Sequence, residues 1–95
     1  MPLIEIRARP GEHDLDAVSA RISAEVAEAI GARPEAVWVS WSVIEHAHGV
    51  PGPIVHVYAR RTAEQIEALT GVLERILGED VFVTVQPVYA LDPDA

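Results

Sequence analysis

The arginines are the residues of this chain whose side chains most directly indicate a chemistry. All seven basic residues are arginine, and the chain contains no lysine. A planar guanidinium can donate two parallel hydrogen bonds to a carboxylate, whereas a lysine ammonium acts as a compact point charge. The composition is that of a protein with a carboxylate ligand, and a genome that prefers arginine codons produces the same bias.

The histidines do not predict a metal site. His46 and His48 lie two residues apart in a connecting segment, and His13 and His56 have no sequence link to them. A metal ion needs several ligands in a suitable geometry. Cysteine is absent, so disulfides and thiolate ligands are excluded. We expect no metal and no other cofactor.

The overall charge and hydropathy narrow the range of partners. A formal charge of −8, from 15 acidic and seven basic residues, argues against binding to nucleic acid, which requires a positive surface. No apolar run approaches the ~20 residues of a membrane span, and the start does not resemble a signal peptide. Together with the lack of cysteine, these features lead us to expect a cytoplasmic protein that does not bind membranes.

Two stretches of the chain share one pattern: PLIEIRAR at 2–9 and PIVHVYAR at 53–60. Each begins with proline, continues with alternating apolar residues and ends in Ala-Arg. The alternation predicts strands at 3–8 and 54–59, each with one buried face.

A helix is expected after each of these strands. Between Asp14, a suitable N-cap, and Gly31, which is placed to end a helix, apolar residues recur at helical spacing. In the second half, Thr62 and Gln65 have the spacing of a capping box, and Gly78 ends the apolar stripe.

A further strand is expected after each helix, at 36–45 and at 81–86, where VWVS and VFVT match one another. We predict an α+β two-layer fold, a tandem βαβ repeat whose four-stranded mixed sheet carries both helices on one face. The chain forms a single domain, 1–95, with a first unit at 2–45, a connection at 46–52, a second unit at 53–89 and a tail at 90–95.

The face of this sheet that points away from the helices also carries apolar residues. They are Trp38 or Trp41 from the first unit and Tyr58 or Phe82 from the second. Because two helices cannot cover both faces, we expect a homo-oligomer that packs through its sheet faces.

Several of these features together resemble the tautomerase superfamily over nearly the whole chain. They are the Met-Pro start, the LIEIRAR strand, the turn GARPEAV at 31–37 and the second unit from Pro53. The resemblance is greatest to members with two fused βαβ units, such as macrophage migration inhibitory factor (the MIF-like members). Among these it is nearest to a bacterial branch of unassigned function. It implies a homotrimer with the sheets forming an inner barrel, and a tautomerase or isomerase without a cofactor.

The resemblance also implies a catalytic role for Pro2. Removal of Met1 would make Pro2 a secondary amine, and burial would lower its pKa below the ordinary α-amino value of ~8. A neutral amine could then act as a general base that moves a proton between the keto and enol forms of a small acid. The nitrogen of Pro53 is an amide and has no such basicity. A retained Met1 would exclude the same role for Pro2.

The cationic positions of the superfamily are only partly matched. The arginine that follows strand 1 in short-chain members such as 4-oxalocrotonate tautomerase corresponds to Glu12, and a second arginine, on strand 2, corresponds to Trp38. A lysine of the MIF-like members corresponds to Ala32, with Arg33 adjacent. These departures put dicarboxylate substrates in doubt.

Two further positions implied by the resemblance lie on the last strand. An aromatic residue and an amide of the MIF-like members correspond to Phe82 and Thr84. We expect Phe82 and Trp38 to form an apolar wall.

Strand geometry excludes two arginines from the Pro2 site of their own chain and favours two others. Arg7 and Arg9 are too distant, because they lie on the order of 15–20 Å along the first strand from Pro2, at ~3.3 Å per residue. If strands one and three run antiparallel, Arg60 and Arg61 approach Pro2 and could bind the carboxylate of a small-molecule substrate.

Three functions remain open from the sequence. The first is a tautomerase with Pro2 as base and with Arg60, Arg61 or Arg33 as the substrate-binding cation. The second is a non-catalytic trimer of the same fold that binds a small ligand or a partner. The third is a ferredoxin-like dimeric αβ barrel related to small monooxygenases, because ARPGEHD resembles the entry to their first helix.

Overall fold

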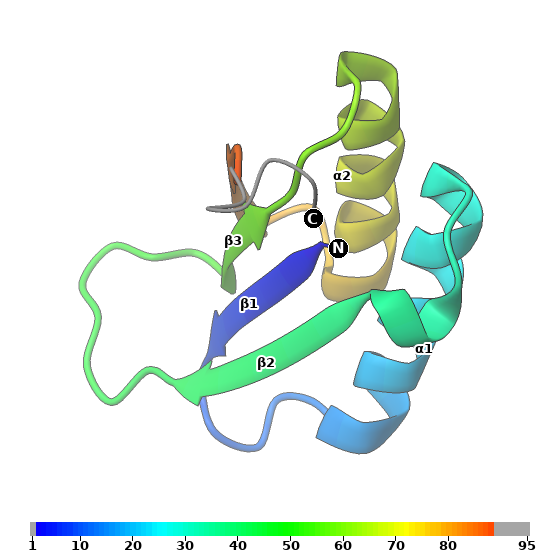
Figure 1. Ribbon diagram of the computed structural model, residues 1–95. Helices are drawn as coiled ribbons and strands as arrows, with labels where there is room; N and C mark the ends of the chain where they lie inside the picture. Colours follow the sequence, from blue (N-terminus) through cyan, green and yellow to red (C-terminus); the bar gives the residue numbers. More distant parts are fainter. Residues whose placement is uncertain (1, 89–95) are drawn as a thin grey trace.

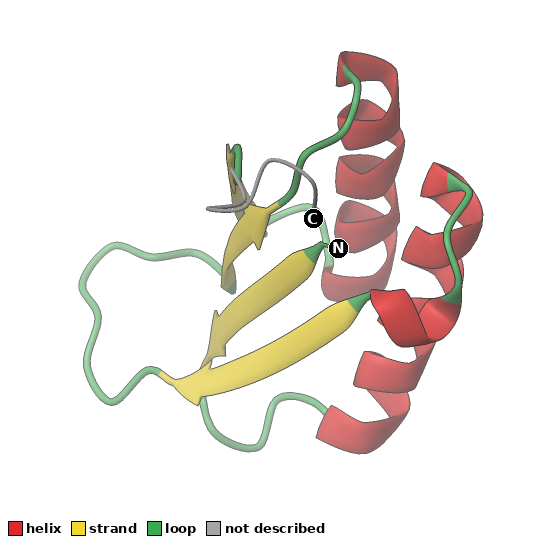
Figure 2. Ribbon diagram, in the orientation of Figure 1, coloured by secondary structure: helices red, strands yellow, loops and turns green. Residues whose placement is uncertain are grey.

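A computed structural model describes residues 2–88 of the chain, and its elements follow the predicted order (Figures 1 and 2). Met1 and residues 89–95, which include the expected tail, lie outside the described residues. The elements are β1 (Leu3–Ala8), α1 (Leu15–Ile30), a short 3-10 helix η1 (Pro34–Ala36), β2 (Trp38–Val43), β3 (Ile54–Tyr58), α2 (Ala63–Leu77) and β4 (Phe82–Gln86).

The sheet confirms the tandem βαβ repeat. Its strand order is β2-β1-β3-β4, with β1 parallel to β2, β3 parallel to β4, and β1 antiparallel to β3. In a ferredoxin-like fold the two strands of a βαβ unit are separated by another strand. Here the two strands of each unit are hydrogen-bonded neighbours, so the ferredoxin-like alternative is wrong.

Both helices have the predicted caps. The carboxylate of Asp14 accepts a hydrogen bond from the backbone N–H of Ala17 at 3.2 Å, and Gly31 ends α1 with a φ of 70°. Thr62 and Gln65 form a capping box at the start of α2, which satisfies backbone donors that the helix leaves unpaired. The Gln65 amide also donates to the carbonyl of Ile30 at 3.1 Å, linking the start of α2 to the end of α1.

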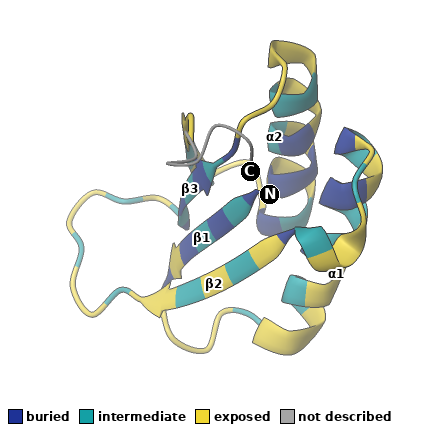
Figure 3. Ribbon diagram, viewed as in Figure 1, coloured by how far each residue is buried: buried dark blue, intermediate teal, exposed yellow. Residues whose placement is uncertain are grey.

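The core lies between the two helices and one face of the sheet (Figure 3). On β1 and β3 the inward residues are fully buried because alternate side chains of a strand point to the same face. Fully burying an aliphatic side chain contributes about 1.5–3 kcal/mol each, so this layer is the main source of stability. The fully buried members on the sheet and helices include Ile4, Ile6, Val55, Val57, Ile22, Val26, Leu69 and Leu73.

In the described part of the chain, no helix lies over the opposite face of the sheet, which we call the open face (Figure 3). The strand register arranges its side chains in three rows across the four strands. The first row is Trp38, Leu3, Tyr58 and Gln86; the central row is Ser40, Glu5, His56 and Thr84; the third row is Ser42, Arg7, Ile54 and Phe82.

The aromatic side chains divide between the two faces. Trp38 is 53% exposed and Phe82 is 60% exposed, both on the open face. Trp41 lies on the helix side, where its indole N–H donates to the Ser19 hydroxyl of α1 at 2.6 Å. The expected uncovered apolar face is therefore present, with Trp38 rather than Trp41 on it.

Within residues 2–88, neither helix combines the length and the apolar character that a bilayer crossing requires.

Candidate active site

Pro2 lies directly before β1 at one end of the sheet, and its side chain is fully buried. Its carbonyl oxygen accepts a hydrogen bond from the backbone N–H of Trp38 at 2.9 Å. This bond extends the parallel pairing of β1 and β2 by one step, so it holds Pro2 in line with the sheet. The ring that the sequence singles out is thus both buried and fixed in position.

The antiparallel pairing on which the arginine prediction depended is confirmed. Leu3 of β1 lies opposite Tyr58, the last residue of β3. Arg60 and Arg61 follow Tyr58 within three residues of the chain, so they are at the same end of the sheet as Pro2.

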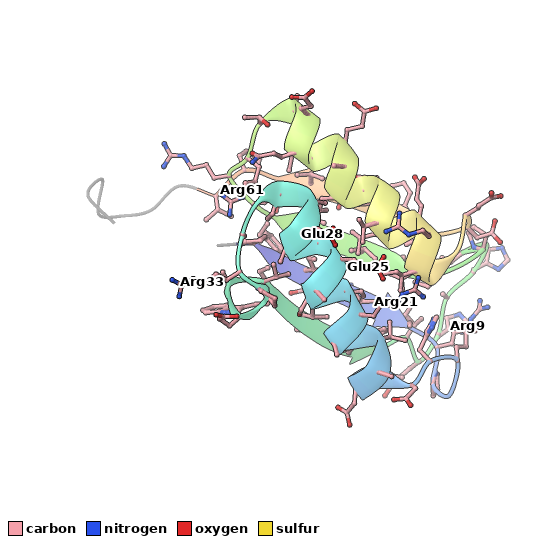
Figure 4. All side chains as sticks on the ribbon, turned by 90° about the vertical axis from the view of Figure 1, so that its right-hand side faces the viewer. Arg9, Arg21, Glu25, Glu28, Arg33 and Arg61 are labelled. Carbon is pink, nitrogen blue, oxygen red and sulfur yellow. The ribbon has the colours of Figure 1, made fainter. Side chains whose placement is uncertain are left out.

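Arg33 comes to this end from a different element. It precedes η1, in the turn between α1 and β2, and its side chain is exposed. Figure 4 shows Arg33 and Arg61 at the same end of the molecule and Arg9 at the other end. The Pro2 end of this acidic chain therefore gathers several of its cations.

Trp38 and Tyr58 flank Leu3 on the open face, immediately beside Pro2. Both are cross-strand partners of Leu3, one on β2 and the other on β3. Tyr58 is not among the site residues that the sequence predicts. Its alternation with Val57 marked it as a surface position, but only the β1–β3 register places it next to Pro2. The first row of the open face thus presents an aromatic, an aliphatic and a second aromatic side chain.

Phe82 and Thr84 are not brought to Pro2 within one chain. Phe82 pairs with Ile54, which pairs with Arg7, so it lies at the far end of the open face from Trp38. The two rows are four residues apart along a strand, about 13 Å at ~3.3 Å per residue. The expected wall of Phe82 and Trp38 therefore does not form within a single chain.

Thr84 lies in the central row instead. Its hydroxyl is 2.7 Å from Nδ1 of His56 and donates to the carbonyl of Val55 at 3.5 Å. Glu5 is the β1 partner of His56 in the same row. The open face is therefore polar at its centre and aromatic at two opposite corners.

The large hollows of the surface lie away from Pro2. Two open hollows of about 600 and 640 Å³ are both lined by residues 43–47, and Arg7 joins the lining of the first and Arg9 that of the second. Both are at the opposite end of β1, so we do not assign them to the Pro2 site. Among residues 2–88, no three His, Cys, Asp or Glu side chains gather in a way that could hold a metal ion.

Comparison with known proteins gives a fold but no sequence relative. No protein-family model and no curated protein matches the chain. Solved structures do match. A fused 4-OT asymmetric trimer is 17% identical, with 90% of this chain and 85% of that chain covered and a TM-score of 0.75. The protein Pt0534 inactivated by 2-oxo-3-pentynoate is 22% identical, with the same coverage and a TM-score of 0.76.

A third match is macrophage migration inhibitory factor from Giardia lamblia. It is 17% identical, with 90% of this chain and 97% of that chain covered and a TM-score of 0.65. The chain therefore has the tautomerase-superfamily fold. More particularly, it has the form with two βαβ units in one chain, as in the fused 4-OT and MIF structures.

Proposed function

We propose that this chain is a cofactor-independent tautomerase of a small keto or enol acid, with Pro2 as its general base after Met1 is removed. The observation that carries the proposal is the placement of Pro2. Its buried ring directly precedes β1, and the antiparallel β3 brings Arg60 and Arg61 to the same end of the sheet.

The chemistry requires two functions from these residues. Burial disfavours an ammonium and lowers the pKa of a free Pro2 amine, so the nitrogen can accept a proton near neutral pH. It takes a proton from the carbon beside the substrate carbonyl, and the resulting ammonium returns a proton to the other end of the enolate. Arg60, Arg61 or Arg33 would bind the substrate carboxylate through charge-assisted hydrogen bonds.

The first row of the open face favours substrates that carry an apolar group. Trp38, Leu3 and Tyr58 present apolar and aromatic surface beside Pro2. An aryl or other apolar group can pack on this surface. With Glu12 and Trp38 at the positions of two superfamily arginines, a monocarboxylate fits better than a dicarboxylate.

We further propose a homotrimer that packs through the open faces. The fused 4-OT that this chain resembles in fold is a trimer, and the exposed Trp38 and Phe82 give the open face an apolar character. Because Phe82 and Thr84 lie far from Pro2 in their own chain, any contribution they make to a site would come from a neighbouring copy.

The decisive experiment measures the ketonisation of phenylenolpyruvate after intact mass has established whether Met1 is removed. Pro2→Ala should lower kcat/KM by about 100-fold or more, the usual contribution of a general base. Pro53→Ala is the matched control and should leave kcat/KM nearly unchanged. Full activity in Pro2→Ala, or a retained Met1 in an active protein, would refute Pro2 as the base.

A covalent probe gives an independent readout. The amine of Pro2 can add to the alkyne of 2-oxo-3-pentynoate, forming a C–N bond while the neighbouring carbon gains a proton. Mass spectrometry should then find one intact reagent on the amino-terminal peptide. No adduct on that peptide, under conditions in which the enzyme turns over, would contradict a reactive Pro2 amine.

The second candidate is a non-catalytic trimer that binds a small ligand. The replacement of two superfamily cations by Glu12 and Trp38 favours it. It predicts saturable binding of phenylpyruvate without measurable turnover in the Met1-processed protein.

A further inference from the structure

A third, smaller hollow lies on the helix side of the sheet, away from Pro2. Its volume is about 310 Å³, near the lower end of the ~300–1,000 Å³ typical of small-molecule sites. It is formed where β1 ends, the chain turns into α1, and the second half of β2 passes. The side chains that matter for its chemistry are Arg9, His13, Leu15, Trp41 and Val43.

The lining offers a preformed aromatic surface. The Trp41 indole N–H is already satisfied by the Ser19 hydroxyl at 2.6 Å, so the ring is held in place and needs no polar partner from a ligand. The His13 ring lies 5.8 Å from the Trp41 ring, centroid to centroid, at a tilt of 40°. Such spacing is typical of paired aromatic rings.

Two aliphatic side chains at the rim are exposed without an apparent structural need. Leu15 is 49% exposed and Val43 is 62% exposed, although apolar side chains of this size gain from burial. Exposed apolar surface gathered around a hollow marks a ligand or interaction site more often than isolated exposed residues do. An apolar group that filled the hollow would cover both side chains.

The charge of the lining is opposite to that of the whole chain. The chain has 15 acidic and seven basic residues, yet among residues 2–88 no acidic side chain lines this hollow, whereas Arg9 and His13 do. The nearby Glu12 lines the adjoining hollows instead. The Arg9 guanidinium is exposed, and its one hydrogen bond to the described part of the chain is a long one, 3.4 Å, to the carbonyl of Val50. It can therefore turn to an anion at little cost.

We propose that this hollow is a second binding site, for a small aromatic carboxylate. The ring of the ligand packs between Trp41, Leu15 and Val43, and its carboxylate pairs with Arg9. The site is separate from the proposed catalytic end because Pro2 and Arg9 stand at opposite ends of β1 (Figure 4 shows Arg9 far from Arg33 and Arg61). The proposal does not depend on Pro2 being catalytic.

Tryptophan fluorescence can test this site selectively. The chain has two tryptophans, so Trp38→Phe leaves Trp41 as the only one. Titrating this variant with phenylacetate should give a saturable change in emission. The uncharged analogue phenylacetamide should bind at least about tenfold more weakly, the loss expected from about 1.4 kcal/mol of missing charge-assisted pairing.

Three further variants in the Trp38→Phe background decide the outcome. Arg9→Gln and Val43→Glu should each weaken phenylacetate binding at least about tenfold, because one removes the cation and the other adds a carboxylate at an exposed rim position. Arg75→Gln, on α2 and outside the lining of the hollow, should leave binding unchanged. Circular dichroism verifies that each variant is folded.

The proposal is overturned by the absence of a saturable Trp41 response. It is also overturned if phenylacetamide and Arg9→Gln bind as well as phenylacetate and the parent do, or if Pro2→Ala abolishes the response. A change in native mass caused by Val43→Glu, without any phenylacetate binding, would instead assign the hollow to a contact between copies.

Discussion

Pro2 and Pro53 occupy equivalent places at opposite ends of the sheet. Each is buried, and each carbonyl oxygen accepts a 2.9 Å hydrogen bond from the first residue of the strand that closes its own unit, Trp38 for Pro2 and Phe82 for Pro53. The two prolines are thus structural duplicates. They differ chemically in one respect, because only Pro2 can present a free amine.

This difference predicts the effect of blocking the amino terminus. A short, uncleavable extension before Pro2 turns its nitrogen into an amide like that of Pro53. We expect phenylenolpyruvate activity to fall by about 100-fold or more, since an amide cannot act as the base, while the melting temperature changes little. An extended protein with normal kcat would disprove the role of the amine.

The arginines at the Pro2 end should act mainly on substrate binding. A hydrogen bond to a charged group contributes about 1.5–3 kcal/mol, so Arg60→Gln or Arg61→Gln should raise KM by about 10- to 100-fold and change kcat less. Steady-state kinetics on phenylenolpyruvate separate the two parameters. Arg9→Gln, at the far end of β1, is the matched control. If Arg60→Gln, Arg61→Gln and Arg33→Gln each leave KM unchanged, none of these three arginines binds the substrate carboxylate.

Trp38 should determine which acids are accepted. Trp38→Arg places a cation on the open face beside Leu3 and removes aromatic surface. We expect kcat/KM for an enol dicarboxylate to improve relative to phenylenolpyruvate by about tenfold, roughly the value of one added charge-assisted pair. Trp38→Leu removes the ring without adding charge and should not give this preference. If the ratio of kcat/KM for the dicarboxylate to kcat/KM for phenylenolpyruvate is unchanged in Trp38→Arg, Trp38 does not contact the substrate.

Phe82 should matter for assembly because it is an exposed aromatic residue on the open face. Phe82→Asp would bury a carboxylate between packed sheets, at a cost of several kcal/mol for an unpaired charge. We expect native mass spectrometry to show a shift from trimer to monomer. Leu15→Asp introduces the same charge at an exposed apolar position on the helix side and should leave the trimer intact. An unchanged trimer in Phe82→Asp would show that the copies pack elsewhere.

Glu25 predicts a pH dependence of stability. Hydrogen bonds from Arg75 of α2 and then Arg21 of α1, both at 2.6 Å, lower the pKa of Glu25 below its ordinary value of 4.5. Figure 4 labels Glu25 and Arg21 on α1. A carboxylate whose pKa is lower in the folded than in the unfolded protein stabilises the fold at pH values above its unfolded-state pKa. This contribution is lost as the pH falls through the folded-state pKa.

Glu25→Gln should therefore lower the melting temperature slightly at neutral pH, and the difference from the parent should disappear in acid. The effect is small because the pair is solvent-accessible. Glu28→Gln on the same helix is the control, since Glu28 makes no ion pair with residues 2–88. Thermal melts at several pH values measure both variants. A deficit that persists below the folded pKa would contradict the ion-pair explanation.

Local features of the sequence determined the elements and their repetition. The alternation in β1 and β3 and the caps Asp14, Gly31 and Thr62 act over a few residues, so the chain alone specifies them. The βαβ order twice over then restricts the connections to right-handed crossovers. These constraints were sufficient to predict the mixed sheet, the two helices on one face and the uncovered opposite face.

The tertiary structure decided which residues meet. Tyr58 joins Pro2, Phe82 lies far from it, and Trp41 rather than Trp38 faces the helices, because each placement depends on strand register. Register is set by hydrogen bonds between segments up to about half the chain apart, and a shift of one residue would exchange the two faces. The hollow beside Trp41 has the same origin. It joins Arg9 of the loop after β1, Leu15 at the start of α1 and Val43 at the end of β2, and only the packed fold brings these three together.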